Sequence, residues 1–516
     1  MPNPILSDGG RVVRAIFVIL CGAALTTAQT AALREQRTAQ YMQTIRRQPL
    51  LLLAFLRDMP KGGDLHNHLG GAIYAENLID FAAQDGMCVD RATSSLVPAP
   101  CDTSCDKSAA KPSVRCSYHD QLLYNTLIDA WSMRNWERGH ESGHDHFFAS
   151  FDKFYVAMAN HMGEAIALAA HQAATDHLQY VELMHTADGM DSAQLGMKLG
   201  WNQNFAEMRD RFLSGGLKDV AAATRKKLED DETKMREKLR CESSTPDPGC
   251  AVKIRYLYQV LRDLAPEAVF AQILLGFELA SADPHFVGLN LVTPEDWYVP
   301  MRDFDLHMKM LDYLHGVYPK VHISLHAGEL SDELVTPAAM SFHIRESVEV
   351  GHAERIGHGV DAMNERDALG LLHEMAKRNI LVEICLTSND TILGVRGDHH
   401  PFPTYRRYNV PVALASDDEG VSRSDLTHEY LRAVESYNLS YADLKAMARQ
   451  SLEHSFLPGS SLWADARATH AVTACEPDRA HGAKRSASCQ KFLDSNEKAG
   501  MQWKLEKEFV QFEAKF

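Results

Sequence analysis

The stretch that decides the fold reads VHISLH at residues 321–326, PAAMSFHIRESVEV at residues 337–350 and RIGH at residues 355–358. The two outer segments are short runs typical of β-strands, and the middle segment has the apolar spacing of an α-helix. A strand, a helix and a second strand in this order indicate a parallel sheet, because parallel strands need a helical crossover between them.

The same alternation extends in both directions along the chain. Strands are expected at residues 61–66, 178–184, 252–260, 286–292, 321–326, 355–358, 380–386 and 410–416. Helical patterns separate most of them, as at residues 305–316, 337–350 and 365–378. Eight such units close into a barrel, so we expect an α/β fold of the TIM-type (β/α)8 class.

Segments outside this alternation divide the chain further. We expect a signal peptide at 1–28, a helical extension at 29–58, the barrel at 59–470, and a disulfide loop with a final helix at 471–516. Within the barrel, two insertions are expected: a cysteine-bearing loop after the first strand, at about 87–118, and a helical insert at about 190–250.

The composition is that of a folded, acidic protein. Of the 516 residues, 45% are hydrophobic and 24% are charged, which excludes disorder for the bulk of the chain. Lys and Arg number 53 against 69 Asp and Glu, a formal net charge of −16 at pH 7. Such a surface repels phosphate backbones and argues against nucleic acid as the main partner.

The N-terminus has the layout of a secretory signal peptide. Arg11 and Arg14 precede an apolar run at residues 15–25, and Thr26 and Ala28 stand at plausible cleavage positions. A membrane anchor is the alternative, but the run is about half of the ~20 apolar residues that a spanning helix needs. We therefore expect an exported protein, periplasmic or extracellular, with no membrane span after cleavage.

Export makes disulfides possible among the nine cysteines that follow the expected signal peptide, which itself contains Cys21. Cys385 lies in an expected buried strand and is predicted to be a free thiol. The other candidates are two pairs that flank polar loops, Cys241 with Cys250 and Cys475 with Cys489, and one cluster of four: Cys88, Cys101, Cys105 and Cys116. The cluster allows three connectivities, which stay open. A zinc knuckle is less favoured there because the cluster lacks a Cys-x-x-Cys pair.

Polar residues stand at the ends of four expected strands, where barrel enzymes hold their active sites. The first strand ends in DLHNH, which places His66 and His68 on one face because strand side chains alternate. The segment SLHAGE adds His326 and, just past the strand, Glu329. Each motif taken alone also occurs in surface turns.

Two further strand ends complete the set. In RIGHG, His358 lies between two glycines, which leave the ring uncrowded. In ASDDEG, Asp417 and Asp418 begin a run of three acidic residues, which repel one another unless a cation or hydrogen-bond donors are present. Three histidines and one aspartate at successive strand ends predict a mononuclear zinc site with an open position for water.

The set resembles the adenosine deaminase family. The resemblance is carried by MPKGGDLHNH (59–68), HAGE (326–329), RIGHG (355–359) and SDD (416–418), and covers roughly residues 59–455. The signal peptide, the helical extension and the cysteine-bearing insertion look like the extracellular branch of that family, the adenosine deaminase-related growth factors. We expect an exported, bacterial-type member.

The resemblance implies a role for each matching residue. One zinc ion per chain would be bound by His66, His68, His326 and Asp417. His358 would orient the attacking water and help to deprotonate it, and Glu329 would protonate the purine N1. Asp418 would hydrogen-bond the purine N7, and Gly328 and Thr293 would line the purine pocket.

Three positions depart from the family pattern. Many members have an aspartate two residues after the second zinc histidine, where it contacts the ribose, and this chain has Gly70. The extracellular branch often has an aspartate directly after that histidine, and this chain has Leu69. Thr293 replaces a glycine of the purine-contacting segment. These changes leave the zinc chemistry intact and leave the choice of nucleoside open.

The sequence thus predicts an exported adenosine deaminase that converts adenosine or 2′-deoxyadenosine to the inosine product and ammonia. Its partner would be a small-molecule purine nucleoside, and a homodimer is possible because the growth-factor branch suggests one. Two alternatives remain: another amidohydrolase-superfamily hydrolase, acting on a different aminopurine or a cyclic amide, and a non-enzymatic nucleoside-binding, growth-factor-like protein.

Overall fold

The structure is a computed structural model that describes residues 32–479 and 485–516. The expected signal peptide at 1–28 lies outside the described residues. Eight parallel strands form one sheet, in which each strand pairs with the next along the chain. They are β1 (Gly62–His68), β4 (Leu178–His185), β5 (Lys253–Leu261), β6 (Phe286–Val292), β7 (His322–Ala327), β8 (Arg355–His358), β9 (Leu381–Ile384) and β10 (Val412–Leu414).

The sheet closes on itself between β1 and the residues that follow β10. Asn67 and Asp417 form a parallel bridge. The Asp417 N–H donates to the carbonyl oxygen of His66 at 2.9 Å, and the His68 N–H donates to the carbonyl oxygen of Asp417 at 3.0 Å. The predicted (β/α)8 barrel is therefore confirmed, and all eight expected strands exist within a few residues of their expected bounds.

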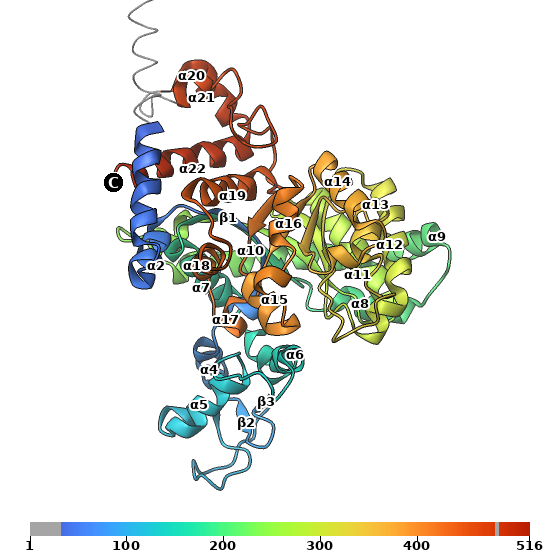
Figure 1. Cartoon of the computed structure of the whole chain (residues 1–516). Helices are drawn as coiled ribbons and strands as arrows, with labels where there is room; N and C mark the ends of the chain where they lie inside the picture. The colour runs from blue at the N-terminus through green and yellow to red at the C-terminus, as the bar shows by residue number, and fades with distance from the viewer. Residues whose placement is uncertain (1–31, 480–484) are drawn as a thin grey trace, which may run out of the picture.

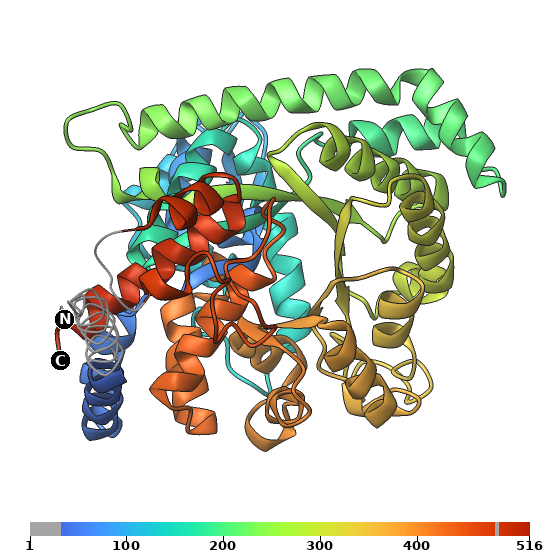
Figure 2. The same ribbon diagram turned by 90° about the horizontal axis from the view of Figure 1, so that it is seen from above.

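Helices surround the barrel, as Figures 1 and 2 show. Those that follow the later strands are α11 (Pro266–Ala282), α12 (Tyr298–Val317), α13 (His343–Glu349), α14 (Ala368–Arg378), α15 (Leu386–Leu393), α16 (Phe402–Arg407), α17 (Glu419–Ser422), α18 (Leu426–Tyr437) and α19 (Tyr441–Glu453). The strands β4 and β6 are buried at every position. Burial on both faces explains why β6, FVGLNLV, reads as a nearly continuous apolar run rather than as an alternating one.

Most of the segment between β1 and β4 forms the lobe at the bottom of Figure 1, although its last helix lies above the lobe, in the main body of the molecule. Its helices are α3 (Leu69–Ala72), α4 (Ala75–Gln84), α5 (Gln121–Ala130), α6 (Gly143–Phe154) and α7 (Met162–Thr175). Within the predicted loop at 87–118 the structure has a small antiparallel pair, β2 (Cys88–Asp90) and β3 (Ser95–Val97). Strands of three residues are too short to show a period, so the sequence pattern did not reveal them.

The predicted helical insert at 190–250 contains α8 (Asp191–Leu199), α9 (Phe205–Phe212) and α10 (Lys218–Lys238). A π-helical turn at Leu213–Leu217 joins the last two, and Gly216 there has φ 126°. Only glycine adopts that backbone conformation readily, so the helical insert is kinked at this point. In Figure 2, α10 is the long green helix along one edge of the molecule.

The two ends of the described chain pack together. The extension is helical at 32–45 and in α2 (Pro49–Asp58), and the C-terminal part contains α20 (Glu476–Arg479), α21 (Ala487–Asp494) and α22 (Glu497–Glu513). The rings of Phe55 and Phe512 lie 5.1 Å apart. The apolar residues Trp503, Leu505 and Phe509 of α22 are likewise buried inside the chain. They are therefore not available to join two subunits, and the predicted homodimer is not supported.

The structure contains four disulfides: Cys88–Cys101, Cys105–Cys116, Cys241–Cys250 and Cys475–Cys489. Of the three connectivities that the sequence left open, the cluster thus pairs its neighbours. Among the described residues, Cys385 is a free and buried thiol, as predicted, although it stands after β9 at the start of α15 rather than inside the strand. Four disulfides indicate an oxidising compartment. In the described part of the chain, no helix is long and apolar enough to cross a bilayer.

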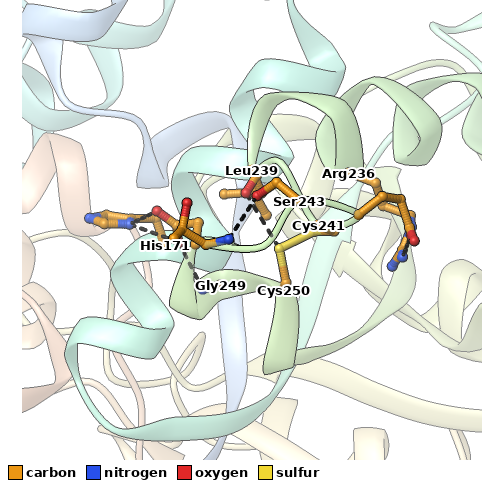
Figure 3. Close-up of a disulfide and its surroundings, with 10 residues drawn as sticks. His171, Arg236, Leu239, Cys241, Ser243, Gly249 and Cys250 are labelled. Atoms are coloured by element: carbon orange, nitrogen blue, oxygen red, sulfur yellow. Dashed lines mark hydrogen bonds and ion pairs between the residues drawn. A yellow bond between two sulfur atoms is a disulfide. The ribbon is translucent and has the colours of Figure 1, made fainter.

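Replacing both Cys241 and Cys250 with serine should lower the free energy of unfolding by about 2–3 kcal/mol. The bridge closes a loop with a sequence separation of 9 (Figure 3), and opening it restores chain entropy to the unfolded state. The melting temperature of the double variant measures the loss. Ser243→Ala, in the same loop, is the control and should change stability by less than ~0.5 kcal/mol. An unchanged melting temperature in the double variant would contradict the prediction.

Candidate active site

Four side chains converge on one point. They come from β1, from β7 and from the segment that follows β10. Each of them offers a ligand atom within 4.8 Å of the other three: His66, His68, His326 and Asp417. The Nε2 atoms of His68 and His326 are 3.1 Å apart, and Asp417 Oδ1 lies 3.4 Å from Nε2 of both His66 and His68. The structure therefore brings together all the residues that were predicted to bind the metal.

The three histidine rings are held by polar partners behind them. The Nδ1 atoms of His66, His68 and His326 lie 2.7 Å from Glu383 Oε2, 3.0 Å from Gln259 Oε1 and 2.8 Å from Asn290 Oδ1, respectively. Each Nδ1 thus donates to an oxygen, which leaves each Nε2 as a free lone pair. Nε2 of His66 is buried without a hydrogen-bond partner, which costs free energy unless another group binds it. Three imidazoles and one carboxylate fit a divalent metal ion.

The partners of the histidines were not identified from the sequence. Gln259, Asn290 and Glu383 each interrupt a strand whose neighbouring residues are mostly apolar and buried. A buried polar side chain needs a partner, so a polar residue within an apolar strand is the signal that could have indicated them. Their pairing with particular histidines depends on contacts across the barrel.

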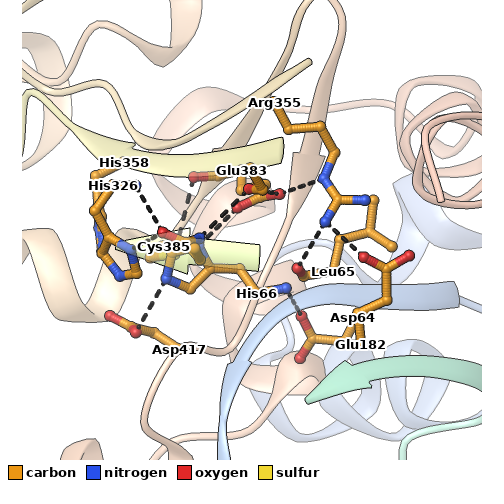
Figure 4. Close-up of polar contacts among 12 residues, drawn as sticks. Asp64, Leu65, His66, Glu182, His326, Arg355, His358, Glu383, Cys385 and Asp417 are labelled. Atoms are coloured by element: carbon orange, nitrogen blue, oxygen red, sulfur yellow. Dashed lines mark hydrogen bonds and ion pairs between the residues drawn. The ribbon is translucent and has the colours of Figure 1, made fainter. Parts of the chain in front are cut away.

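Arg355 contacts Glu383, the partner of His66 in the candidate metal site (Figure 4). Its guanidinium donates to Glu383 Oε1 and to Glu182 Oε2, both at 2.6 Å, and to the carbonyl oxygen of His454 at 2.9 Å. Burial alone would raise the pKa of Glu383, but the charges and hydrogen bonds of Arg355 and His66 hold it below its usual range. Glu383 is thus an ionised acceptor for His66.

Glu329 lies beside this cluster, on the loop after β7. Its backbone N–H donates to Glu295 Oε2 at 2.9 Å, and its Oε1 lies 3.6 Å from Nδ1 of His358. Burial, and then the negative charges of Asp417 and Glu295, raise the pKa of the Glu329 carboxyl well above its ordinary value. Burial and these neighbouring charges therefore favour the protonated form of a carboxyl group that lies next to the candidate metal site.

The ring of His358 is fixed by a chain of hydrogen bonds. Phe402 N–H donates to Nδ1 of His400 at 3.1 Å, so Nε2 of His400 donates to Asn389 Oδ1 at 3.0 Å. The Asn389 amide nitrogen then donates to Nδ1 of His358 at 3.0 Å. A neutral His358 accordingly carries its proton on Nε2. With its proton on Nε2, His358 can donate a hydrogen bond from that atom. It is less suited to removing a proton from the water, which was the second role predicted for it.

Asp418 is buried directly after Asp417, a residue of the candidate metal site, and its side chain lies against α3. A Cβ atom at Gly71 would stand 1.6 Å from Asp418 Oδ1, so position 71 must lack a side chain for Asp418 to be there. Burial and the charge of Asp417 raise the pKa of Asp418 well above its ordinary value. The third acidic residue, Glu419, is also buried.

Gly328 and Thr293 reach the site through their backbones. Gly328 has φ 73°, a Cβ there would lie 2.4 Å from Asp361 Oδ1, and its N–H donates to Glu295 Oε1 at 3.2 Å. Thr293 has φ 78°, a strained conformation for a β-branched residue. Its carbonyl oxygen accepts from Arg262, which also donates to the carbonyl oxygen of His326 at 3.1 Å. Glu295 and Arg262 were not predicted.

A sequence profile described as adenosine deaminase matches residues 239–462. A curated adenosine deaminase from Clostridium perfringens is 31% identical over 135 residues, which are 26% of this chain and 37% of that enzyme. This chain thus matches well under half of the length of that relative. Neither match distinguishes the growth-factor branch, which stays a prediction.

Two solved structures show the same fold. The N6-methyl-AMP deaminase from Arabidopsis thaliana has a TM-score of 0.50 at 20% identity, over 78% of this chain and 94% of that chain. An amidohydrolase from Burkholderia ambifaria with bound Zn has a TM-score of 0.50 at 16% identity, over 79% of this chain and 88% of that chain. The sequence profile thus identifies residues 239–462 as an adenosine deaminase domain, and the curated relative supports the same family.

Proposed function

We propose that the chain is an exported, zinc-dependent adenosine deaminase that hydrolyses adenosine and 2′-deoxyadenosine to the inosine product and ammonia. The observation that carries the proposal is the convergence of three imidazoles and Asp417, with the buried carboxyl of Glu329 nearby, 3.6 Å from His358. Three nitrogens and one oxygen favour zinc among the divalent ions. The disulfides and the predicted signal peptide support export.

The proposal assigns metal binding to four residues and proton donation to Glu329. His66, His68, His326 and Asp417 would hold the ion, which supplies hydroxide at neutral pH by lowering the pKa of a water molecule. As the oxygen bonds to C6, Glu329 donates its proton to N1, so no charge builds up on the purine ring. The C6–N bond then breaks, the attacking oxygen gives its remaining proton to the amino group, and ammonia leaves. The proton released when the hydroxide formed returns Glu329 to its acid form.

Three further residues would position the purine and the water. His358 donates from Nε2 toward the water and orients it, consistent with the acceptor bond at its Nδ1. Asp418, kept protonated by burial and by Asp417, can donate to the purine N7. Gly328 would line the purine pocket with its backbone.

The rate should fall in alkaline solution. Glu329 must be protonated to act as an acid, and its pKa is raised above the ordinary value, so the active form is present below that raised pKa and is lost as pH rises through it. We expect kcat to decrease about tenfold per pH unit above the pKa. A pH profile of kcat tests this, with metal content and melting temperature measured at each pH as controls. A kcat that keeps rising through the alkaline range would contradict the role of Glu329.

The first experiment is to incubate the purified mature protein with zinc and adenosine near neutral pH and to measure inosine and ammonia. Turnover would support the zinc site and the purine chemistry together. If zinc stays bound without turnover, other aminopurines and cyclic amides should be screened, since the other amidohydrolase function is the next candidate. Binding of adenosine with no reaction on any of these compounds would favour the non-enzymatic nucleoside-binding alternative.

A further inference from the structure

A buried carboxylate holds the backbone of the loop that carries Glu329. It belongs to Glu295, in the loop between β6 and α12, and only 1% of its side chain is exposed. Oε1 accepts from the Gly328 N–H at 3.2 Å, and Oε2 accepts from the Glu329 N–H at 2.9 Å. Successive backbone N–H groups that converge in this way form a binding site for an anion. Glu295 thus occupies such a site, directly at the residue that would donate the proton.

The other side of the same loop is held by the segment after β8. The carbonyl oxygen of Gly328 accepts from the Val360 N–H at 2.8 Å and from the Asp361 N–H at 3.1 Å. The carbonyl side of the loop therefore stays anchored without Glu295. The N–H side depends on Glu295, so a change at Glu295 should shift Glu329 locally and leave the loop in its place.

His343, at the start of α13, supports the carboxylate of Glu295. Its Nδ1 lies 2.6 Å from Oε1 of Glu295, and both side chains are buried. The imidazole ring stacks on the ring of Phe304, with 4.2 Å between the centroids. Burial would raise the pKa of Glu295, but the charges of His343 and Arg262 help to hold it below its ordinary value. Glu295 is therefore an ionised acceptor for the two backbone N–H groups.

We propose that Glu295 is a positioning residue for the proton donor: it fixes the backbone of Glu329, and His343 in turn fixes Glu295. This inference rests on the proposed function, in which Glu329 protonates N1 of the purine. A displacement of about 1 Å in a reacting group can cost about 10²-fold in rate. The polar contacts of Glu295 are with Gly328, Glu329 and His343, none of which is a predicted metal ligand. Metal binding should therefore not depend on Glu295.

Glu295→Gln tests the proposal. Glutamine has nearly the same shape but only one acceptor oxygen, so one of the two backbone N–H groups loses its partner. We expect kcat for adenosine to fall about 10–100-fold, while KM changes by less than about threefold and the zinc content is unchanged. Hydrogen exchange of the amides at 328 and 329, measured by mass spectrometry, should become at least about tenfold faster. An unchanged kcat, unchanged exchange, or a fall in kcat that accompanies loss of zinc overturns the proposal.

His343→Phe is the second variant, and it decides the question if Glu295→Gln does not fold. Phenylalanine can keep the stacking on Phe304 but leaves Oε1 of Glu295 without the imidazole. We expect kcat to fall about 3–10-fold with zinc retained, a smaller loss than in Glu295→Gln because both backbone contacts remain. A His343→Phe variant with the kcat of the unaltered protein would contradict the support that His343 gives to Glu295.

Asp247→Asn is the matched control. Asp247 also accepts from a backbone N–H, that of Gly249 at 2.8 Å, and also pairs with a histidine, at 2.9 Å from Nδ1 of His171. It precedes β5, at the opposite end of the barrel strands from the candidate site. Its kcat should stay within about twofold of the unaltered protein, since that end of a barrel contributes to stability and not to the reaction. If the unaltered protein binds zinc and does not deaminate adenosine, the proposed function fails and this inference fails with it. If it does deaminate adenosine and both variants keep its kcat, only this inference fails.

Discussion

His326→Ala should lose both turnover and metal, whereas Glu329→Gln should lose turnover and keep the metal. His326 offers one of the three converging Nε2 atoms, 3.1 Å from that of His68, and alanine leaves the ion with three ligands at most. Glutamine at 329 has nearly the shape of the protonated acid but cannot give up a proton. Removal of a general acid costs about 10²–10⁴-fold in rate, so the expected kcat of Glu329→Gln is reduced by that factor.

Metal analysis of the purified variants and kcat for adenosine separate these two effects. His322→Ala is a matched control because His322 lies on the same strand as His326, pairs with Glu354 at 2.8 Å and has a side chain that is 44% exposed. It should keep both metal and turnover. A fully active Glu329→Gln would remove the proton donor from the mechanism. A His326→Ala variant that binds zinc normally would show that the four converging residues are not the ligand set.

The candidate site residues could be predicted from the sequence because a parallel barrel brings the C-terminal ends of all its strands to one face. All eight parallel strands point the same way, so polar residues at their C-terminal ends meet in space even when hundreds of residues separate them. His66 and Asp417 come together in this way. Their backbones also form the closing bridge of the sheet, in which Asp417 N–H donates to the His66 carbonyl oxygen at 2.9 Å. The barrel seam and the metal ligands are thus positioned by the same hydrogen bonds.

What the sequence did not predict depends on contacts between elements. Glu383 is one polar residue in a strand of four, and nothing local says that it accepts from His66. The proton position on His358 follows from Asn389 and His400, which lie in α15 and in the segment after it. The pairing within the cysteine cluster likewise required distances, since spacing alone allowed three connectivities.

Arg355→Met should destabilise the barrel and weaken the metal site together. The guanidinium is fully buried between Glu182 and Glu383, at 2.6 Å from each. Methionine leaves two buried carboxylates without their counter-charge, which costs about 3–5 kcal/mol of unfolding free energy when one partner of a buried ion pair is removed. Thermal and denaturant unfolding of the metal-free protein measure this loss.

The second effect passes through Glu383. Without Arg355, burial favours the neutral form of Glu383, which accepts a hydrogen bond from His66 less strongly. Loss of a partner of this kind reduces metal affinity by about 10–100-fold, and a competitive zinc titration measures it. Arg302→Met is the control: Arg302 is a surface residue that pairs with Asp303 at 2.6 Å, and its loss should cost about 1 kcal/mol or less. If Arg355→Met were destabilised with unchanged zinc affinity, Glu383 would not depend on Arg355 to hold His66. The two measurements together therefore decide whether the buried ion pairs only support the fold or also tune the metal ligands.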